Sequence, residues 1–222
     1  MMIAYPAADI CCEIREDKIR TIVIENQHMF YNMISDIRSQ LDGNKGEVVL
    51  SEDHIPLDMR KAADLLTQFV PFTVNQKELI TKLYAALKKK AVDEKMYQYT
   101  QEIYRGIGEY LYKLIEDEEN ELVITIPEDI TGILKAFDVR FDDSEMTLPE
   151  KLLEYMLSTN EFKGERLFIT VNLRSYLTDK ETVELFQSLL LKKIRLMCIE
   201  SSEFPHLKME DIIIIDKDMC VI

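Results

Sequence analysis

Hydrophobic residues follow two different periods along this chain, one typical of helices and one typical of strands. Between residues 76 and 118 they recur every three or four positions, which is the spacing of a helix with one apolar face. Leu79, Leu83 and Leu87 lie on one face of the first predicted helix. The middle of the chain is therefore predicted to be helical.

A second helix is predicted over the rest of this stretch, with Asp93 as its N-cap. Its apolar face consists of Met96, Tyr99, Ile103, Ile107, Tyr110 and Leu114. Only the tripeptide AVD separates it from the first helix, so we expect the two to pair as an antiparallel hairpin. The tyrosines of this helix are expected to pack in a core and not to stack on bases.

After residue 118 the pattern alternates between short apolar runs and helical segments. The predicted strands are 122–126, 139–141, 166–172, 194–200 and 211–216, and the predicted helices are 128–137, 148–158 and 179–193. Such alternation indicates a mostly parallel sheet with helices packed on it. The runs at 166–172 and 211–216 are almost wholly apolar, as strands covered on both faces should be.

The N-terminal part of the chain carries further strand and helix signals. Residues 10–24 predict two strands joined by a turn, residues 26–41 a helix, and residues 47–50 a short strand. Pro56 and Pro71 bracket a short helical segment. We therefore predict one α/β domain built from both ends of the chain, with a helical insert between them.

The predicted boundaries of this organisation are 1–59 and 119–222 for the α/β domain and 60–118 for the helical insert. The insert also differs in charge from the rest of the chain. The 222 residues include 27 basic and 41 acidic side chains, a net charge of −14, which argues against nucleic acid as a partner. Residues 60–113, however, hold ten basic and six acidic residues, so this segment is +4 and the remainder −18.

Two interpretations of the basic residues stay open. The first is a solvated lysine face, with Lys88–Lys90 favoured by the helix dipole at a helix C-terminus. The second is a surface that binds the phosphate backbone without reading sequence, because lysine offers a point charge. The candidate DNA-binding residues are Lys77, Lys82, Lys88, Lys89, Lys90, Lys95 and Arg105.

Motifs that carry catalysis are missing from the sequence. There is no GxxxxGK[ST], no HExxH and no GxSxG, and the single GxG, at Gly106 and Gly108, lies in mid-helix, where it indicates close approach of two helices. The loop that follows residues 166–172 offers Asn172, Arg174 and Ser175 at a strand end, but Thr178 or Asp179 is better interpreted as a helix cap. We therefore predict that the protein is not an enzyme.

Targeting and redox signals are equally sparse. The N-terminal residues lack a basic region followed by a long apolar one, and no apolar stretch has the length of a membrane span. The four cysteines have no CxxC spacing and are expected to be reduced and buried in strands. A cytoplasmic protein without a membrane partner is expected.

Several segments together resemble one family, the type II-A CRISPR-associated spacer-acquisition proteins, which form tetrameric rings on DNA ends. The segments are FTVNQKELITKLY at 72–84, ENELVITIPEDIT at 119–131, ILKAFDVRFDD at 133–143, RLFITVNLRSYLTDKETV at 166–183 and DIIIIDKDMCVI at 211–222. This chain departs from the family in carrying Val123 and Thr125 where relatives have acids, in the segment CIESSEFPH, and in an apparent insertion at residues 51–70.

The resemblance implies an α/β head similar in topology to P-loop ATPases but without their phosphate loop, and a helical leg. It implies a homotetrameric ring whose basic inner wall encircles double-stranded DNA ends without cutting them. The implied partners are the CRISPR integrase complex and the type II RNA-guided nuclease. The implied role is support of spacer acquisition in antiviral defence.

Calcium is the implied metal, and residues 114–130 hold the acids to bind it. Hard cations take several oxygen ligands, and the candidate ligands Glu119, Glu121, Glu128 and Asp129 lie at both ends of one predicted strand. The alternative is that this acidic cluster is simply solvated.

Two other functions remain open. One is an acidic α/β scaffold for protein–protein contacts that does not bind DNA and whose lysines only aid solubility. The other is a degenerate nucleotide-binding regulator that uses the loop after residues 166–172.

Overall fold

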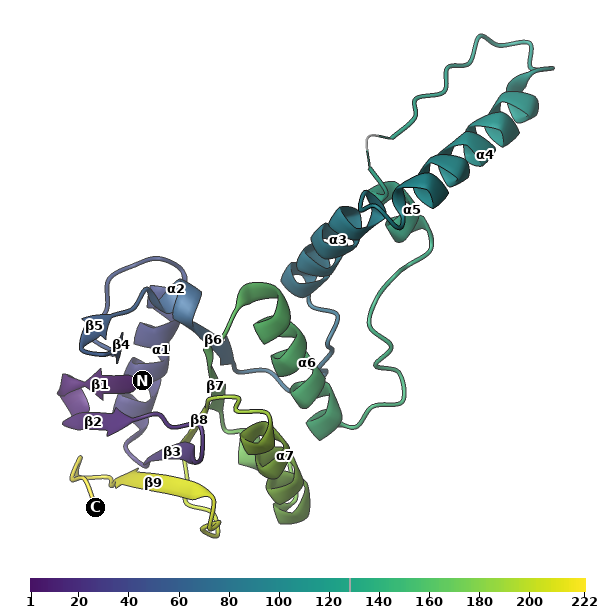
Figure 1. Ribbon diagram of the computed structural model, residues 1–222. Helices are drawn as coiled ribbons and strands as arrows, with labels where there is room; N and C mark the ends of the chain where they lie inside the picture. Colours follow the sequence, from purple (N-terminus) through teal and green to yellow (C-terminus); the bar gives the residue numbers. More distant parts are fainter. Residues whose placement is uncertain (128) are drawn as a thin grey trace. The chain divides into compact units, whose positions relative to one another are not determined.

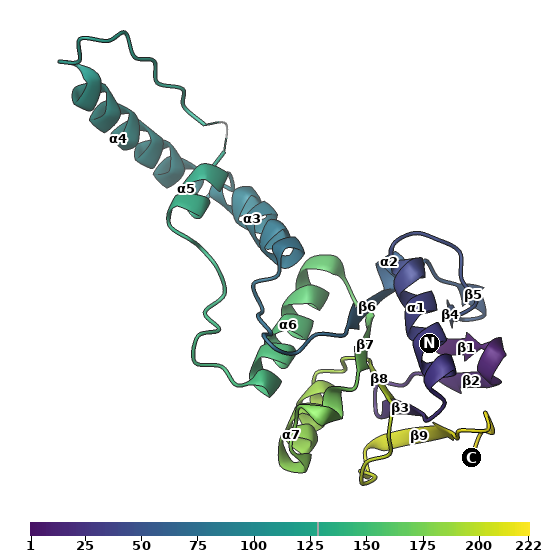
Figure 2. The same ribbon diagram turned by 180° about the vertical axis from the view of Figure 1, so that it is seen from behind.

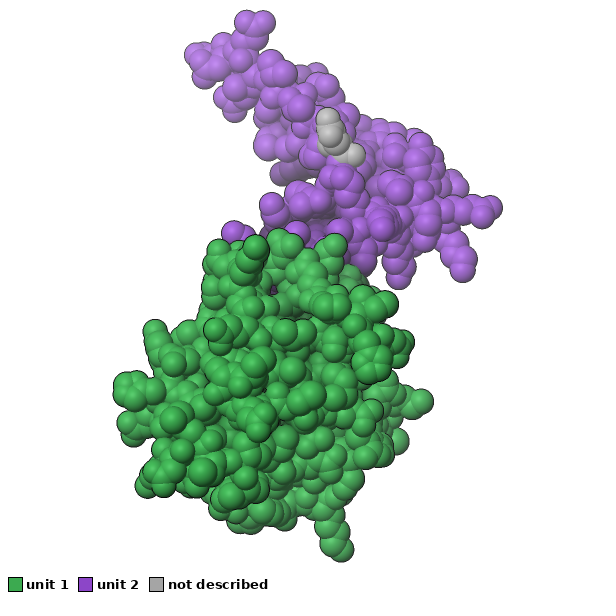
Figure 3. Space-filling view, turned by 90° about the vertical axis from the view of Figure 1, so that its left-hand side faces the viewer, with its two compact units in different colours: residues 1–74, 143–222 green, residues 75–142 purple. Residues whose placement is uncertain are grey.

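The computed structural model describes residues 1–127 and 129–222, and its chain divides into two compact units. Unit 1 consists of Met1–Val74 and Asp143–Ile222, and unit 2 of Asn75–Asp142 (Figure 3). Unit 1 is the α/β part of the chain and unit 2 is helical.

Unit 1 is built on a five-stranded sheet in which all neighbouring strands are parallel (Figure 1). In spatial order its strands are β6 (Ala63–Leu66), β7 (Leu167–Val171), β8 (Leu196–Glu200), β3 (Ile19–Ile24) and β9 (Glu210–Ile215). Every residue of β7 and β8 is buried, as their apolar sequences predicted. The predicted α/β class with a mostly parallel sheet is confirmed.

Helices cover both faces of this sheet, with α1 (Gln27–Leu41) on one side and α6 (Leu148–Lys163) and α7 (Asp179–Leu191) on the other (Figures 1 and 2). The helix α1 begins where the side chain of Asn26 accepts a hydrogen bond from the backbone N–H of Met29. Met29, Met33 and Ile37 then form its buried face, which is the face the sequence predicted.

A small antiparallel sheet packs beside α1. Its order is β2 (Ile10–Glu13), β1 (Met2–Tyr5), β4 (Val49–Glu52) and β5 (Ile55–Pro56). The two strands predicted within residues 10–24 both form, but they belong to different sheets, since β2 pairs with β1 whereas β3 lies between β8 and β9. One buried core joins this small sheet, α1 and the central strands of the large sheet.

Residues 60–74 belong to unit 1 and not to the helical insert. A short helix, α2 (Met59–Ala62), leads directly into β6, which pairs with β7 in the main sheet. Phe72, which follows, is buried, and its ring packs edge-on against Tyr155 with 5.7 Å between the ring centroids. The chain therefore divides at residues 75 and 142, where the sequence had placed the insert at 60–118.

Unit 2 contains α3 (Lys77–Ala91), α4 (Tyr97–Ile115) and the short α5 (Thr131–Ala136). The predicted antiparallel hairpin is wrong, because α4 continues outward from the end of α3 and does not fold back along it (Figures 1 and 2). The joint is a tight turn, in which the Asp93 side chain accepts from the backbone N–H groups of Lys95 and Met96. Thr100 in α4 donates a hydrogen bond to the carbonyl oxygen of Ala91, 2.8 Å away, which holds the two helix ends together.

The strands predicted at 122–126 and 139–141 do not form among the described residues. Both segments lie outside regular secondary structure, and Val123 is 87% exposed. The two ends of unit 2 are joined instead by side-chain hydrogen bonds. The Asn75 amide donates to the Phe141 carbonyl oxygen and accepts from the Phe141 N–H, at 3.0 and 2.9 Å.

Candidate nucleic-acid interface

The helix α3 presents a lysine face because its apolar residues lie on the other side. Leu79 is buried and Leu83 is half-buried, whereas Lys82 and Lys89 are exposed. These two lysines are seven residues apart, so they lie on one face with about 10 Å between them along the helix axis. Two exposed point charges on one face suit contacts with the phosphates of a nucleic-acid backbone.

Lys88, Lys89 and Lys90 occupy the last turn of α3, where the helix dipole favours cations. Lys88 forms an ion pair within the chain, since its Nζ donates to Asp129 Oδ2 at 2.6 Å. That hydrogen bond, together with those from Thr131, holds the pKa of the Asp129 carboxyl well below its usual range. The remaining two lysines of the turn are exposed.

All seven candidate DNA-binding residues are exposed on unit 2, including Lys77, Lys95 and Arg105. Arg105 lies 3.9 Å from Glu109, one turn further along α4, and both side chains are highly exposed. The structure thus places each candidate at the surface of one unit. The set offers charge to a phosphate backbone and only one forked, base-reading side chain, which is typical of contacts without sequence preference.

Charge is strongly segregated within unit 2. Residues 75–142 hold ten basic and fourteen acidic residues, a net charge of −4, in contrast to the +4 of the segment chosen from sequence. The basic excess is confined to residues 77–105, with seven basic and four acidic side chains. Residues 109–142 hold three basic and ten acidic ones.

The candidate calcium ligands are not gathered into one site by the described residues. Glu119 and Glu121 lie in an exposed stretch, Asp129 is engaged by Lys88, and Glu128 lies outside the described residues. Within the described part of the chain, no group of three or more His, Cys, Asp or Glu side chains lies close enough together to hold a metal. Glu119, Glu121 and Asp129 therefore do not form a calcium site by themselves within the described part of one chain, and calcium stays a prediction.

The loop after β7 is used for structure. Asn172 has a left-handed backbone conformation, with φ of 54°, and its side chain accepts from the backbone N–H of Ser201. Thr178 caps α7 in a reciprocal capping box with Glu181, which confirms the interpretation of Thr178 as a cap.

Arg174, a candidate ligand-binding residue in the sequence, lies instead in a buried ionic cluster with Glu200 and Glu210. Its guanidinium contacts Glu210 at 3.4 Å and Asp179 at 3.2 Å, and donates to the carbonyl oxygen of Pro205. Sequence analysis missed Glu200 and Glu210. The signal that could have indicated them is an acid directly at the end of an apolar strand, where the neighbouring residues are buried.

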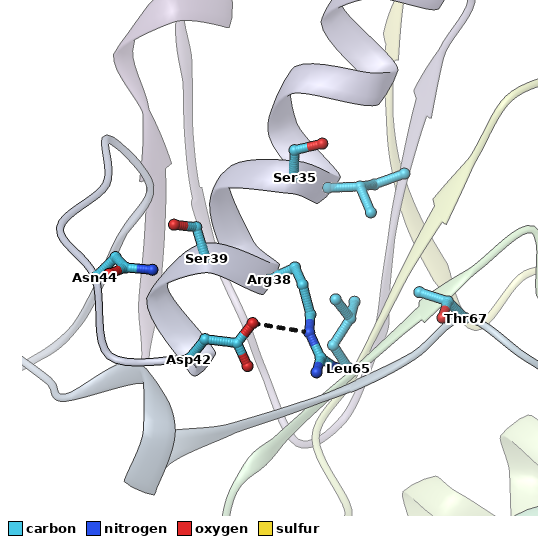
Figure 4. Close-up of a pocket in the computed structure, with 8 residues that line it drawn as sticks. Ser35, Arg38, Ser39, Asp42, Asn44, Leu65 and Thr67 are labelled. Carbon is cyan, nitrogen blue, oxygen red and sulfur yellow. Dashed lines mark hydrogen bonds and ion pairs between the residues drawn. The ribbon is translucent and has the colours of Figure 1, made fainter.

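A cavity of about 600 Å³ lies beside α1 in unit 1 (Figure 4). It is lined by Ile34, Ser35, Arg38, Ser39, Asp42, Asn44, Leu65 and Thr67. Arg38 and Asp42 form an ion pair of 3.3 Å within it, and neither histidine nor cysteine is among the lining residues. The described lining therefore assembles no recognisable nucleophile and base.

The cysteines were predicted to be reduced and buried in strands. Cys12 and Cys198 are buried in strands, while Cys11 and Cys220 are exposed, and all four are free thiols. The expectation of buried cysteines therefore holds for two of them.

None of the described helices combines the length and the apolar character of a membrane span.

Comparison with known proteins identifies a family. The model of the CRISPR-associated protein family Cas_Csn2 matches residues 40–219, which is most of the chain. Comparison with the curated proteins gives no match.

Two of the solved structures that match this chain cover more than nine tenths of it. The structure of Stu0660 of Streptococcus thermophilus has a TM-score of 0.58 and 14% identity, with 96% of this chain and 74% of that chain covered. At that identity the similarity shows a shared fold. A putative ABC transporter ATP-binding protein from Pyrococcus furiosus has a TM-score of 0.40 and 10% identity, covering 92% and 88%, which is too distant to support an inference.

Proposed function

This chain belongs to the Cas_Csn2 family of CRISPR-associated proteins, and from that membership we propose that it binds double-stranded DNA ends in support of spacer acquisition. In this proposal four copies form a ring around the duplex and cut nothing. The integrase complex and the type II RNA-guided nuclease are its proposed partners. Capture of new spacers for antiviral defence is the proposed outcome.

The observation that carries the DNA-binding part is the exposed basic row on unit 2. Lys82 and Lys89 are exposed on one face of α3, with Lys90 and Lys95 exposed beyond them. A chain of net charge −14 gains nothing from a phosphate backbone unless its cations are collected on one surface. The segregation of charge within unit 2 supports such a surface.

A ring also predicts which DNA molecules bind. A duplex with free ends can thread through a closed ring, whereas a covalently closed circle cannot. We expect the protein to retain linear duplex and to release closed circles of the same sequence in a filter-binding assay. Retention should fall steeply with salt, because lysine–phosphate contacts release counterions. Equal retention of the two forms would contradict threading.

The surface itself is tested by charge reversal. Lys82→Glu with Lys89→Glu should lower affinity for any sequence by a similar factor and flatten the salt dependence. The matched control is Lys180→Glu with Lys192→Glu, since both lysines are exposed around a helix of unit 1 and the change in net charge is the same. Unchanged affinity in the first variant, or an equal loss in both, would mean that the basic row is only a solvated surface and does not bind DNA.

The second candidate function is an acidic scaffold for protein contacts. One observation favours it, which is the uncovered apolar face of α4. In the same assay a scaffold retains neither linear nor circular DNA at any salt concentration.

A further inference from the structure

Two carboxyl groups and one guanidinium are buried together in unit 1. Glu200 is the last residue of β8 and Glu210 the first of β9, while Arg174 lies in the short 3-10 helix η2 (Leu173–Ser175). The three residues are 0%, 8% and 4% exposed, respectively. With both carboxyl groups ionised, the cluster would have a net charge of −1 away from water. Burial of an unpaired charge is costly, so we expect the cluster to hold one proton.

The hydrogen bonds indicate which carboxyl group holds that proton. Both oxygens of Glu210 accept, one from the Thr21 hydroxyl at 2.8 Å and one from the Leu207 N–H at 3.0 Å. Glu200 accepts through one oxygen, from the backbone N–H of Arg174 at 3.2 Å. Its other oxygen, Oε2, has no hydrogen-bond partner among the described residues. Because donors stabilise the ionised form, Glu200, with fewer donors, is the acid that keeps the proton.

The surroundings of Glu200 place the loss of this proton near neutral pH. The pKa of Glu200 is raised to about 7, chiefly by burial and also by the charge of Glu210, while the backbone hydrogen bond and the charge of Arg174 lower it. Burial also raises the pKa of Cys198, on the same strand, well above its usual range, so this thiol adds no charge. Asp179 of α7 adds an exposed carboxylate, which pairs with Arg174 at 3.2 Å.

The guanidinium of Arg174 holds a surface loop, residues 201–209, against this cluster. It donates to the Pro205 carbonyl oxygen at 3.0 Å and lies 5.0 Å from the centre of the Phe204 ring. A cation over an aromatic face is attracted to it. Glu210 accepts from the Leu207 N–H in the same loop and contacts Arg174 at 3.4 Å. One arginine therefore links the buried carboxyl groups to the loop.

We propose that Glu200, Glu210 and Arg174 form a pH-sensitive latch, which holds the loop 201–209 while Glu200 is protonated and releases it once Glu200 is ionised. Ionisation adds a second negative charge beside the same cation and leaves Glu200 Oε2 in need of a donor. The Nε of Arg174 has no acceptor among the described residues and can supply that donor. A guanidinium drawn to Glu200 gives up its contacts with the loop. The latch lies in unit 1, needs no DNA and goes beyond the proposed function.

A single tryptophan can report on the latch, because the chain has none of its own. Phe204→Trp places it over Arg174, and a tryptophan ring attracts a cation at least as well as a phenylalanine ring does. Its emission should shift to longer wavelength as the pH rises, with one midpoint near pH 7, and quenching by acrylamide should increase over the same range. Far-ultraviolet circular dichroism should stay constant, since a released loop leaves the helices in place.

Two matched variants in the Phe204→Trp background assign the response. Glu200→Gln keeps the size of the side chain but cannot ionise, so the emission should keep its low-pH value throughout. His206 lies in the same loop, beside Glu203, and histidine side chains also change charge in this range. His206→Gln should leave both the midpoint and the size of the shift unchanged.

The loop itself is measured without the tryptophan, by hydrogen exchange of the wild-type chain at about pH 6 and about pH 8. After correction for intrinsic exchange rates, protection of residues 201–209 should fall at the higher pH by more than that of β8. In Glu200→Gln the protection of the loop should be equal at the two pH values.

Any of five results would overturn the latch. They are an emission that ignores pH, a shift that persists in Glu200→Gln, a shift that disappears in His206→Gln, loop protection in the wild type that is the same at both pH values, and circular dichroism that changes together with the emission. The last of these would mean that the whole chain unfolds and that no local release takes place.

Discussion

Lys88 Nζ lies 2.6 Å from Asp129 Oδ2, and this ion pair ties the last turn of α3 to the residues that lead into α5. Asp129 also accepts from the backbone N–H of Thr131, so one carboxylate anchors a lysine and starts a helix. The lysine at the beginning of the basic run is therefore held by its own chain. Its neighbours at positions 89 and 90 are exposed.

The first prediction separates neighbouring lysines. Lys89→Gln should weaken DNA binding and lower the slope of log K against log salt by about 1, as loss of one phosphate contact does. Lys88→Gln should change that slope less, because Lys88 is already paired with Asp129. Binding isotherms at three salt concentrations give both slopes. Equal slopes for the two variants would contradict this division of roles.

The second prediction concerns pH and Glu200. This side chain is fully buried, and one of its carboxylate oxygens has no hydrogen-bond partner among the described residues. Burial raises the pKa of Glu200 to about 7, against the hydrogen bond from the Arg174 backbone and the charge of Arg174, which lower it, while Glu210 raises it further. The folded state therefore binds the proton more tightly than the unfolded chain does.

The sign of the pH effect follows from this difference. The stability that Glu200 contributes is fully present below its ordinary pKa and is lost as the pH rises through about 7. The free energy of unfolding should fall by about 1 kcal/mol between pH 6 and pH 8. Urea titrations of the wild type and of Glu200→Gln measure it, and the variant should lose most of this dependence. A dependence of the same size in Glu200→Gln would assign it to another group.

The third prediction concerns Asp143, which is 7% exposed at the point where the chain re-enters unit 1. Its carboxylate accepts from the Thr73 hydroxyl at 2.7 Å and from the buried backbone N–H of Val74 at 2.9 Å. Asp143→Ala leaves that N–H without this acceptor and should cost about 1–3 kcal/mol in urea denaturation. The control is Asp17→Ala, since Asp17 is exposed and pairs with Arg15 on the surface. A loss no larger than that of the control would show that Val74 finds another acceptor.

The strands of unit 1 show which elements can be predicted from the local sequence. The strands β7 and β8 were predicted because runs such as Leu167–Val171 are apolar at every position, and that pattern is typical of strands covered on both faces. The strand β6 was missed because Ala63–Leu66 has helical composition. Its extended form depends on pairing with β7, about a hundred residues further along the chain, and local propensity does not report such a contact.

Unit 2 shows where the local pattern misleads. Residues 122–126 have the β-branched composition of a strand, but the described chain offers them no neighbour to pair with. The short link before α4 predicted a hairpin, whereas its turn directs α4 away from α3. The candidate lysines were placed correctly at the surface, yet a lysine face has the same sequence whether it binds phosphate or water. Their role therefore rests on the experiments above.

The last prediction concerns what neutralises the acidic residues that follow α4, namely Glu116, Asp117, Glu118, Glu119 and Glu121. Glu119 and Glu121 are candidate calcium ligands, and the alternative is that these acids are simply solvated. Calcium needs several oxygen ligands in one place, and the described residues of one chain do not gather them.

In this proposal calcium takes its remaining ligands from a neighbouring chain, and we expect calcium, but not magnesium or chelator, to raise the melting temperature and the sedimenting mass of the wild type. The control carries Glu119→Lys and Glu121→Lys, which removes two candidate ligands and should respond to neither ion. Calcium, unlike magnesium, prefers irregular oxygen cages. A melting temperature and a sedimenting mass that ignore calcium, magnesium and chelator alike would leave these acids as solvated charge.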